Sequence, residues 1–323
     1  MNILVTGGAG YIGSQTAKAL ARAGFEPVVF DNLCAGHIWA VRWGPLVRGD
    51  LADAVLLRQT LESRRIEAVV HFAAHAYVGE SVTDPRKYYR NNVVCTLNLL
   101  EAMLDAGVRS IVLSSSCAIY GTPDRIPITE DQPPRPVNPY GETKLAAERA
   151  LRSFGQAYGL RWMALRYFNA AGADLDGEIG EDHNPETHLI PLSILAALGR
   201  RPQLEVYGTD YPTPDQTAIR DFVHVSDLAA AHVRALQYLL DGGGSVALNL
   251  GSGTGHSIRQ VVACVEQVGG RPVPVRETRR RPGDPPELVA DASQARRLLD
   301  WNPCCSALET IVETAYRWHQ RHT

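Results

Sequence analysis

The sequence lacks long apolar runs, an excess of one charge and paired cysteine motifs, and each absence excludes a class of protein. No window of its 323 residues approaches the roughly 20 uninterrupted apolar residues that a membrane-spanning helix needs. An apolar strand begins at Asn2 with no basic segment before it, so we expect neither a signal peptide nor a membrane partner. With 45% apolar and 21% charged residues, the composition predicts a soluble globular chain.

The charges nearly balance, since 32 Lys and Arg oppose 35 Asp and Glu for a net charge of −3. A chain without an overall positive field does not attract nucleic acid, so any phosphate ligand must be held by local groups. The six cysteines show no C-x-x-C spacing, and we expect reduced thiols of a cytoplasmic protein without disulfides or a metal site. They are Cys34, Cys95, Cys117, Cys264, Cys304 and Cys305.

Short apolar segments alternate with helical patterns through the first half of the chain. Expected strands lie at residues 3–6, 27–31, 68–72, 110–114 and 162–167, and expected helices lie between them at 13–23, 54–64, 91–106 and 140–159. This alternation predicts a Rossmann-type α/β fold, a doubly wound parallel sheet covered on both faces. We expect a first domain of residues 1–169 plus 223–250 and a smaller α/β domain of residues 170–222 plus 251–323, with a ligand cleft between them.

A glycine-rich turn follows the first expected strand, with the sequence G-G-A-G-Y-I-G at residues 7–13. It satisfies both G-x-G-x-x-G and G-x-x-G-x-x-G, spacings that let a pyrophosphate approach the backbone at a helix N-terminus. The second expected strand ends at Asp31, where a carboxylate accepts hydrogen bonds from adenosine ribose hydroxyls and repels a 2′-phosphate. We therefore expect the protein to bind NAD rather than NADP.

Tyr140 and Lys144 lie four residues apart in an expected helix, so their side chains share a face. A nearby ammonium and a positively charged nicotinamide favour the phenolate and would lower the pKa of Tyr140, which suits a general base. Ser114, Ser115 and Ser116 end an expected strand and would place hydroxyls at the carboxyl edge of the sheet. We therefore expect Tyr140 and Lys144 to be catalytic, beside these hydroxyls.

Further distinctive stretches lie at residues 31–34, 71–74, 78–81, 114–120, 139–144, 165–169, 208–213, 220–225 and 281–284. Together with the glycine turn, they give the chain an end-to-end resemblance to the UDP-glucose 4-epimerase family of extended short-chain dehydrogenases/reductases. The resemblance implies an NAD-dependent isomerase that inverts C4 of a UDP-sugar, UDP-glucose or UDP-galactose, through a transient 4-keto intermediate. It also implies a homodimer formed through residues 91–106 and 140–159.

The resemblance implies roles for individual residues as well. Tyr140 would be the base, Lys144 would bind the nicotinamide ribose, and Ser116 would relay the proton of the sugar 4-hydroxyl. The implied cofactor-binding residues are Gly7, Gly10, Tyr11, Ile12, Gly13, Asp31, Asn32, Asp50, Leu51, Phe72, Ala73, Ala74, Asn91, Ser114, Tyr140, Lys144 and Tyr167. The implied substrate-binding residues are Ser116, Tyr140, Asn169, His188, Leu189, Tyr207, Arg220, Arg281, Asp284 and Leu288. We expect the neighbouring Arg279 and Arg280 to lie in a solvated basic loop.

Three positions depart from the family pattern, and one of them, His188, stands where some relatives have asparagine. Ala76 stands where many relatives carry a lysine that contacts the cofactor. Leu288 stands where the size of the residue limits the room around C2 of the sugar, and leucine is intermediate between the large and small residues found there. UDP-GlcNAc/UDP-GalNAc therefore remains an alternative substrate pair. Residues 76–81 and 116–118 also resemble the corresponding stretches of UDP-xylose/UDP-arabinose epimerases.

Two other classes of protein share this framework. A nucleotide-sugar 4,6-dehydratase needs an acid–base carboxylate pair directly after the serine, where this chain has Cys117 and Ala118. A non-catalytic NAD-binding sensor would be expected to lack the tyrosine or the lysine, and this chain has both. We therefore favour the epimerase.

Overall fold

A seven-stranded parallel sheet forms the centre of the protein in a computed structural model that describes residues 1–281 and 283–322. Its strand order is β10-β6-β5-β4-β1-β2-β3, and every neighbouring pair is parallel. The strands are β1 (Asn2–Thr6), β2 (Glu26–Asp31), β3 (Leu46–Arg48), β4 (Ile66–His71), β5 (Ser110–Ser116), β6 (Arg161–Tyr167) and β10 (Val246–Leu250). The predicted doubly wound α/β fold is thereby confirmed, and the order reverses direction between β1 and β4.

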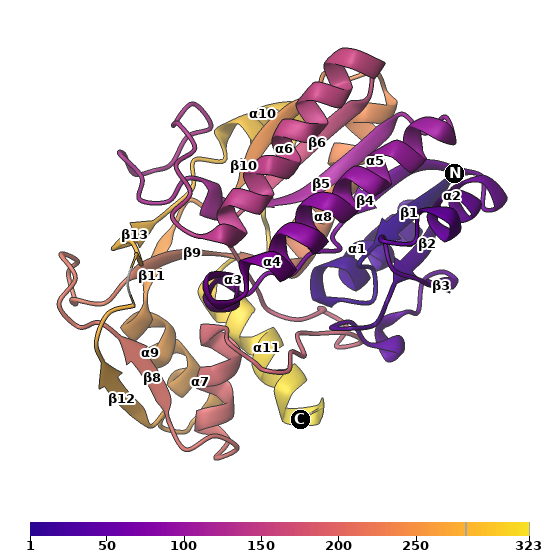
Figure 1. The fold of residues 1–323 in the computed structure, drawn as a ribbon. Helices are drawn as coiled ribbons and strands as arrows, with labels where there is room; N and C mark the ends of the chain where they lie inside the picture. Colours follow the sequence, from indigo (N-terminus) through magenta and orange to yellow (C-terminus); the bar gives the residue numbers. More distant parts are fainter. Residues whose placement is uncertain (282, 323) are drawn as a thin grey trace.

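Helices cover both faces of this sheet (Figure 1). Along β1, Ile3 and Val5 point into one apolar core and Leu4 into the other, as the two-residue period of a strand requires. The first core is closed by α1 (Tyr11–Arg22), α8 (Val225–Leu240) and α10 (Ser293–Leu299), and the second by α2 (Ala54–Ser63), α5 (Cys95–Asp105) and α6 (Pro139–Tyr158). Each fully buried aliphatic side chain in these cores contributes about 1.5–3 kcal/mol. No described helix is long and apolar enough to cross a bilayer.

The helix expected at residues 91–106 is interrupted in the structure. A six-residue π-helix, η2 (Tyr89–Val94), follows the short helices α3 (Val78–Thr83) and α4 (Pro85–Tyr88) and precedes α5. Asn92 lies within it, accepts a hydrogen bond from the backbone N of His75 at 2.8 Å and donates one to the His75 carbonyl at 2.9 Å. The inserted turn therefore directs Asn92 at the chain that follows β4, which places it at the edge where ligands bind in such sheets.

Several segments from the second half of the chain form a smaller α/β unit at one end of the large sheet (Figure 1). Its helices are α7 (Leu189–Ala197), α9 (Ile258–Gly269) and α11 (Leu308–His322), which share an apolar core. Strands β7 (Asn169–Ala171), β9 (Ile219–His224), β11 (Gly255–Ser257) and β13 (Glu287–Leu288) make one small sheet, and β8 (Leu204–Tyr207) with β12 (Val275–Thr278) makes another. The single-turn helices η1 (Ile38–Ala40) and η3 (Cys117–Ile119) complete the described elements.

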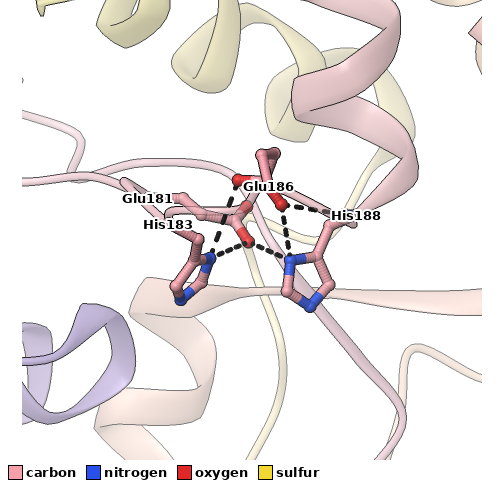
Figure 2. A group of neighbouring side chains, drawn as sticks. All are labelled: Glu181, His183, Glu186 and His188. Carbon is pink, nitrogen blue, oxygen red and sulfur yellow. Dashed lines mark hydrogen bonds and ion pairs between the residues drawn. The ribbon is translucent and has the colours of Figure 1, made fainter. Parts of the chain in front are cut away.

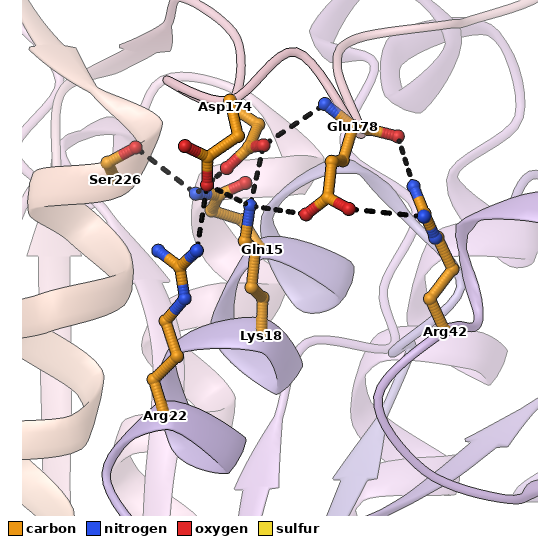
Figure 3. A network of polar contacts seen from close by, with 8 residues as sticks. Gln15, Lys18, Arg22, Arg42, Asp174, Glu178 and Ser226 are labelled. Carbon is orange, nitrogen blue, oxygen red and sulfur yellow. Dashed lines mark hydrogen bonds and ion pairs between the residues drawn. The ribbon is translucent and has the colours of Figure 1, made fainter.

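A buried charge network joins α1 to the loop at residues 174–178 (Figure 3). The Nζ atom of Lys18 lies 2.7 Å from Asp174, 2.9 Å from Asp176 and 2.7 Å from Glu178. The Lys18 side chain is only 2% exposed, so its charge is held by these carboxylates rather than by water. The helix that begins at the glycine turn is thereby fixed to the second half of the chain.

Candidate functional site

The glycine turn lies where the strand order of the large sheet reverses, and its backbone is packed too closely for side chains. Gly7 has a φ of +71°, and a Cβ on it would lie 2.6 Å from the backbone N of Ala73. A Cβ on Gly13 would lie 2.2 Å from the carbonyl oxygen of Gly7. Gly10 is the N-cap of α1, which begins at Tyr11 rather than at the expected residue 13. The unpaired backbone N–H groups of this helix end can therefore receive an anion, so the turn fits a dinucleotide.

Two carboxylates lie near the turn, Asp31 at the end of β2 and Asp50 just after β3. Asp31 accepts hydrogen bonds from the backbone N of Ala9 at 3.0 Å and of Leu33 at 2.8 Å, which fixes its carboxylate next to the glycines. Asp50 accepts a 2.8 Å hydrogen bond from the Nδ2 atom of Asn32, and Leu51 follows it in the second core. The expected adenosine-binding residues are thus neighbours in the structure.

The end of β4 forms the opposite side of the turn. The backbone N atoms of Phe72 and Ala73 donate to the carbonyl oxygen of Thr6 at 2.9 and 3.1 Å, and Ala74 follows them. The Nδ1 and Nε2 atoms of His71 lie 2.6 Å from the Thr6 hydroxyl and 3.0 Å from the Thr96 hydroxyl. Burial, helped by the charge of Lys144, lowers the pKa of His71 to about 3. A neutral imidazole therefore ties β4 to Thr6 of β1 and to Thr96 of α5.

Asn91, an expected cofactor residue, belongs to the π-helix and donates from Nδ2 to the Oδ1 atom of Asn92 at 2.9 Å. The role of Asn92 was missed in the sequence because an asparagine inside a helical pattern gives no sign of an inserted turn. Its Nδ2 atom also lies 3.1 Å from the hydroxyl of Thr143 on α6. Asn92 thus links the cofactor edge to the helix that carries Tyr140.

Tyr140 lies at the start of α6, where its phenol is buried beside the carboxyl end of β5. Burial raises the pKa of Tyr140 to about 12, although a hydrogen bond with Ser116 favours the phenolate. In the protein alone, burial therefore outweighs the contact that favours the phenolate. Lys144 is turned toward the backbone, and its Nζ lies 5.9 Å from the centre of the Tyr140 ring. The lowering of the Tyr140 pKa expected from Lys144 together with a bound nicotinamide stays a prediction.

Lys144 and Ser114 are joined across α6 and β5. The Nζ atom of Lys144 donates a 2.8 Å hydrogen bond to the carbonyl oxygen of Ser114, and burial lowers the pKa of Lys144 to about 8. The Ser114 hydroxyl forms a short hydrogen bond with the phenol of Tyr167 on β6. Ser116 is the last residue of β5, and its hydroxyl accepts from the backbone N of Ala118 at 3.2 Å. The structure therefore brings the predicted catalytic residues together at one strand end.

A buried polar chain behind this group was not found from the sequence. Arg166 on β6 forms an ion pair of 2.6 Å with Glu148 on α6, and Ser115 donates to Glu148 at 2.5 Å. Arg166 also donates to the Tyr120 hydroxyl at 2.9 Å. The signal was the position of Glu148, one helical turn beyond Lys144 on the same face. This chain locks β5, β6 and α6 in one arrangement.

The expected substrate residues gather on the small sheet. Asn169 on β7 donates from Nδ2 to the carbonyl oxygen of Asp221 on β9 at 2.9 Å. Arg220, also on β9, is paired in register with Leu288 on β13, and its guanidinium forms a short ion pair with Asp284. Leu288 packs against the buried apolar group that contains Cys117 and Phe168.

Aromatic rings face the basic loop before β13. The guanidinium carbon of Arg281 lies 3.8 Å from the centre of the Tyr207 ring, so two predicted substrate residues stack on each other. Arg280 lies 4.1 Å from the centre of the Tyr211 ring and forms a 2.6 Å ion pair with Asp210. Arg279 and Arg280 are exposed, in line with the expected solvated loop, and Arg280 also contacts the 207–211 loop.

His188 and Leu189 mark the start of α7, where His188 is the N-cap and Leu189 the first helical residue. The Nδ1 atom of His188 is held by two carboxylates, at 2.8 Å from Glu181 and 2.9 Å from Glu186 (Figure 2). The imidazole was expected to touch substrate, and in the structure one of its nitrogens is engaged by protein groups.

Comparisons with known proteins match this arrangement. Residues 3–251 match the NAD dependent epimerase/dehydratase family. The chain is 53% identical over 320 residues to the UDP-glucose 4-epimerase of Rhizobium meliloti (strain 1021), covering 99% of this chain and 97% of that protein. The structure of UDP-glucose 4-epimerase from Brucella ovis in complex with NAD is similar, with a TM-score of 0.96 at 56% identity, covering 98% and 97% of the two chains. That of UDP-glucose 4-epimerase from Bifidobacterium longum with NAD+ and UDP has a TM-score of 0.94 at 36% identity, covering 100% and 99%.

Proposed function

The chain belongs to the NAD dependent epimerase/dehydratase family, among its UDP-glucose 4-epimerases, and from this membership we propose that it interconverts UDP-glucose and UDP-galactose. The reaction is inversion at C4 of the sugar, with NAD as a bound and recycled cofactor. The observation that carries the proposal is the buried phenol of Tyr140, placed beside Ser116 and Lys144 at the strand end next to the glycine turn. The curated name of the relatives favours the glucose and galactose pair over N-acetylhexosamines and pentoses.

Several described residues suit the cofactor. The glycine turn and the N-terminus of α1 would bind the pyrophosphate, Asp31 and Asn32 the adenosine ribose, and Asp50 with Leu51 the adenine. Phe72, Ala73, Ala74, Asn91, Ser114 and Tyr167 would surround the nicotinamide half. When bound, the nicotinamide supplies a hydride acceptor that is restored within the same turnover.

The side chains of β5 and α6 supply the proton transfers. Tyr140 takes the proton of the C4 hydroxyl as C4 is oxidised and returns it as C4 is reduced. Ser116 shares a hydrogen bond with this phenol and would relay the proton. Lys144 holds its ammonium near the phenol by its bond to the Ser114 carbonyl. The burial of all three keeps water from competing for the keto sugar.

The smaller unit would hold the UDP group while the sugar turns over. Arg220 and Arg281 would bind the diphosphate, Asn169 and the backbone at Leu189 would position it, and Tyr207 would face the uracil. Asp284 keeps Arg220 in place through their ion pair, and Leu288 limits the space around C2.

We propose that the two binding roles are divided between two domains: residues 1–169 plus 223–250 bind NAD, and the remaining segments bind the UDP-sugar. Firm binding of the non-reacting UDP group keeps the substrate on the protein while the loosely held sugar turns over.

The test is replacement of the base. Tyr140→Phe should lower turnover by at least about 100-fold while bound NAD is unchanged, because only the phenolic hydroxyl is lost. Tyr158→Phe, an exposed tyrosine at the far end of the same helix, is the matched control and should retain full activity. Chromatography of UDP-glucose, UDP-GlcNAc and UDP-xylose reactions identifies the substrate. Wild-type turnover by Tyr140→Phe would refute the assignment.

We further propose a homodimer through α5 and α6, which pack side by side. Val94, directly before α5, is 50% exposed, so an apolar side chain extends outward beside these helices. Sedimentation at micromolar concentration should give a dimer for the wild type and a monomer for Val94→Glu.

All six cysteines are free thiols in the structure, which supports a cytoplasmic location.

A further inference from the structure

Three groups of metal-type donors occur among residues 1–281 and 283–322, and two of them are already satisfied by the protein. The acidic group at residues 174–178 surrounds the ammonium of Lys18 (Figure 3). The carboxylate of Asp227 accepts hydrogen bonds from the backbone N atoms of Cys304 and Cys305 and from the Ser306 hydroxyl. The third group consists of Glu181, His183, Glu186 and His188, and we name it the His/Glu cluster.

The four side chains of the His/Glu cluster converge through one donor atom each (Figure 2). The Nδ1 atom of His183 lies 3.2 Å from Glu181 and 3.6 Å from Glu186. The Nδ1 atom of His188 lies 2.8 Å from Glu181 and 2.9 Å from Glu186. In the second and fourth of these pairs Glu186 offers different oxygens, Oε2 to His183 and Oε1 to His188. Ligands at about 2.0–2.1 Å from a tetrahedral Zn²⁺ are separated by about 3.3 Å, and the four His–Glu separations lie on both sides of that value.

Hydrogen bonds account for part of this geometry, since the Glu186 carboxylate also accepts from the backbone N of Thr187 at 2.7 Å and of His188 at 2.8 Å. One donor atom of the cluster remains unexplained. The Nδ1 atom of His183 is buried and makes no hydrogen bond, although two carboxylates lie near it, because it is not aligned with either. The centres of the His183 and His188 rings are only 5.1 Å apart, so two protonated rings would repel each other. A dication would let both rings be neutral and would still balance the two glutamate charges. A metal-ligating nitrogen needs no hydrogen-bond alignment with its neighbours.

We propose that Glu181, His183, Glu186 and His188 bind one zinc ion in a closed, structural site. Two imidazoles with two carboxylates form a mixed N/O donor set that suits Zn²⁺, whereas Ca²⁺ and Mg²⁺ prefer oxygen ligands alone. Four protein ligands leave no open position for substrate, so the ion would act on the fold rather than on the sugar.

The position of the His/Glu cluster explains what the ion would do. His188 is the N-cap of α7, and the Glu181 carbonyl accepts a 3.0 Å hydrogen bond from the indole of Trp318 on α11. The His183 ring meets the edges of Tyr11, from the glycine turn, and Tyr77, before α3. A zinc ion here would pin the 181–188 loop between both halves of the chain. The N-terminus of α7 would then be held in position to bind the diphosphate of the proposed substrate.

The test measures metal in the untagged full-length protein by mass spectrometry after loading with Zn²⁺ and dialysis. Wild type should retain about one zinc per chain, and a chelator should lower its thermal midpoint reversibly. His183→Gln and Glu186→Gln should each weaken zinc binding more than about tenfold and abolish the midpoint shift. The double variant Cys304→Ser/Cys305→Ser, at the other thiol and carboxylate group, should keep the zinc. Circular dichroism checks that each variant is folded.

The alternative is a metal-free cluster in which the histidines and glutamates pair directly with one another. Less than about 0.1 zinc per loaded chain, or zinc that His183→Gln and Glu186→Gln retain, would overturn the proposal.

Discussion

Lys144 and Ser114 are joined by a 2.8 Å hydrogen bond from the lysine ammonium to the serine carbonyl, across the interface of α6 and β5. This bond holds a charge in a buried place, where the pKa of Lys144 falls to about 8. The ammonium is therefore positioned by the sheet rather than by a carboxylate, and it remains free to act on a neighbouring phenol.

Replacing Lys144 by Met should remove that charge with little change in volume. We expect kcat to fall by about 100-fold or more, and the pH at which the rate levels off to rise, because the phenolate of Tyr140 loses a favourable charge. Steady-state rates across pH with UDP-galactose provide the measurement. Lys87→Met, at a partly exposed lysine paired with Glu80, is the matched control. An unchanged pH profile in Lys144→Met would contradict the role.

Replacing Leu288 by Tyr should narrow the space proposed for the sugar. Leu288 is paired in register with Arg220 and packs against the group that contains Cys117, so a larger side chain there would take up part of that space. We expect any turnover of UDP-GlcNAc to fall by about tenfold or more, with turnover of UDP-glucose changed less than about threefold. Leu288→Met, which conserves volume, should change neither. Equal losses for both sugars would indicate general damage to the site.

The ligand-binding edge of the large sheet could be predicted from the sequence, because short local motifs specify the residues there. The glycine turn, Asp31 and the pair Tyr140 with Lys144 each need particular residue types at fixed spacings. The strand expected to end at Ser114 continues to Ser116, since Ser116 still pairs with Tyr167 on β6. The residue at which such a strand ends depends on its pairing with a strand that is distant in sequence. The sequence of the strand alone does not show this pairing.

The smaller unit was less predictable for the same physical reason. Strands β8 and β12 are about 70 residues apart in sequence and pair through residues such as Tyr207 and Thr278. The His/Glu cluster was also missed, because an expectation of no metal rested on cysteine spacing and not on the E-x-H-x-x-E-x-H pattern at residues 181–188. The raised pKa of Tyr140 could not be read from spacing either, since it arises from burial.

Replacing Lys18 by Met should destabilise the protein strongly. The variant would leave the buried carboxylate of Asp174 and its neighbours Asp176 and Glu178 without their shared cation (Figure 3). Removing one partner of a buried ion pair costs about 3–5 kcal/mol, which urea unfolding can measure. Asp176→Asn, at the exposed member of the network, should cost much less. A similar small loss for Lys18→Met would mean that water replaces the ammonium.

Stability should fall in mild acid because of neutral buried histidines. Burial lowers the pKa of His71 to about 3 and of His224 and His232 to about 4, whereas an unfolded histidine titrates near 6.5. Below pH 6.5 the unfolded chain therefore binds protons that the folded chain refuses, so the free energy of unfolding decreases as pH falls. Each such histidine should account for a loss of about 1 kcal/mol between pH 6.5 and 5.5.

His71→Gln isolates one of these contributions. Glutamine can bond to the Thr6 and Thr96 hydroxyls but does not titrate, so the variant should be less stable at pH 6.5 yet lose about 1 kcal/mol less than wild type on going to pH 5.5. Urea unfolding at the two pH values gives both free energies, and the comparison uses their difference within each protein. His256→Gln, at a half-buried histidine on β11, is the control and should change this difference less. If wild type and His71→Gln lost the same free energy, the imidazole of His71 would have to be protonated in the folded protein at pH 5.5.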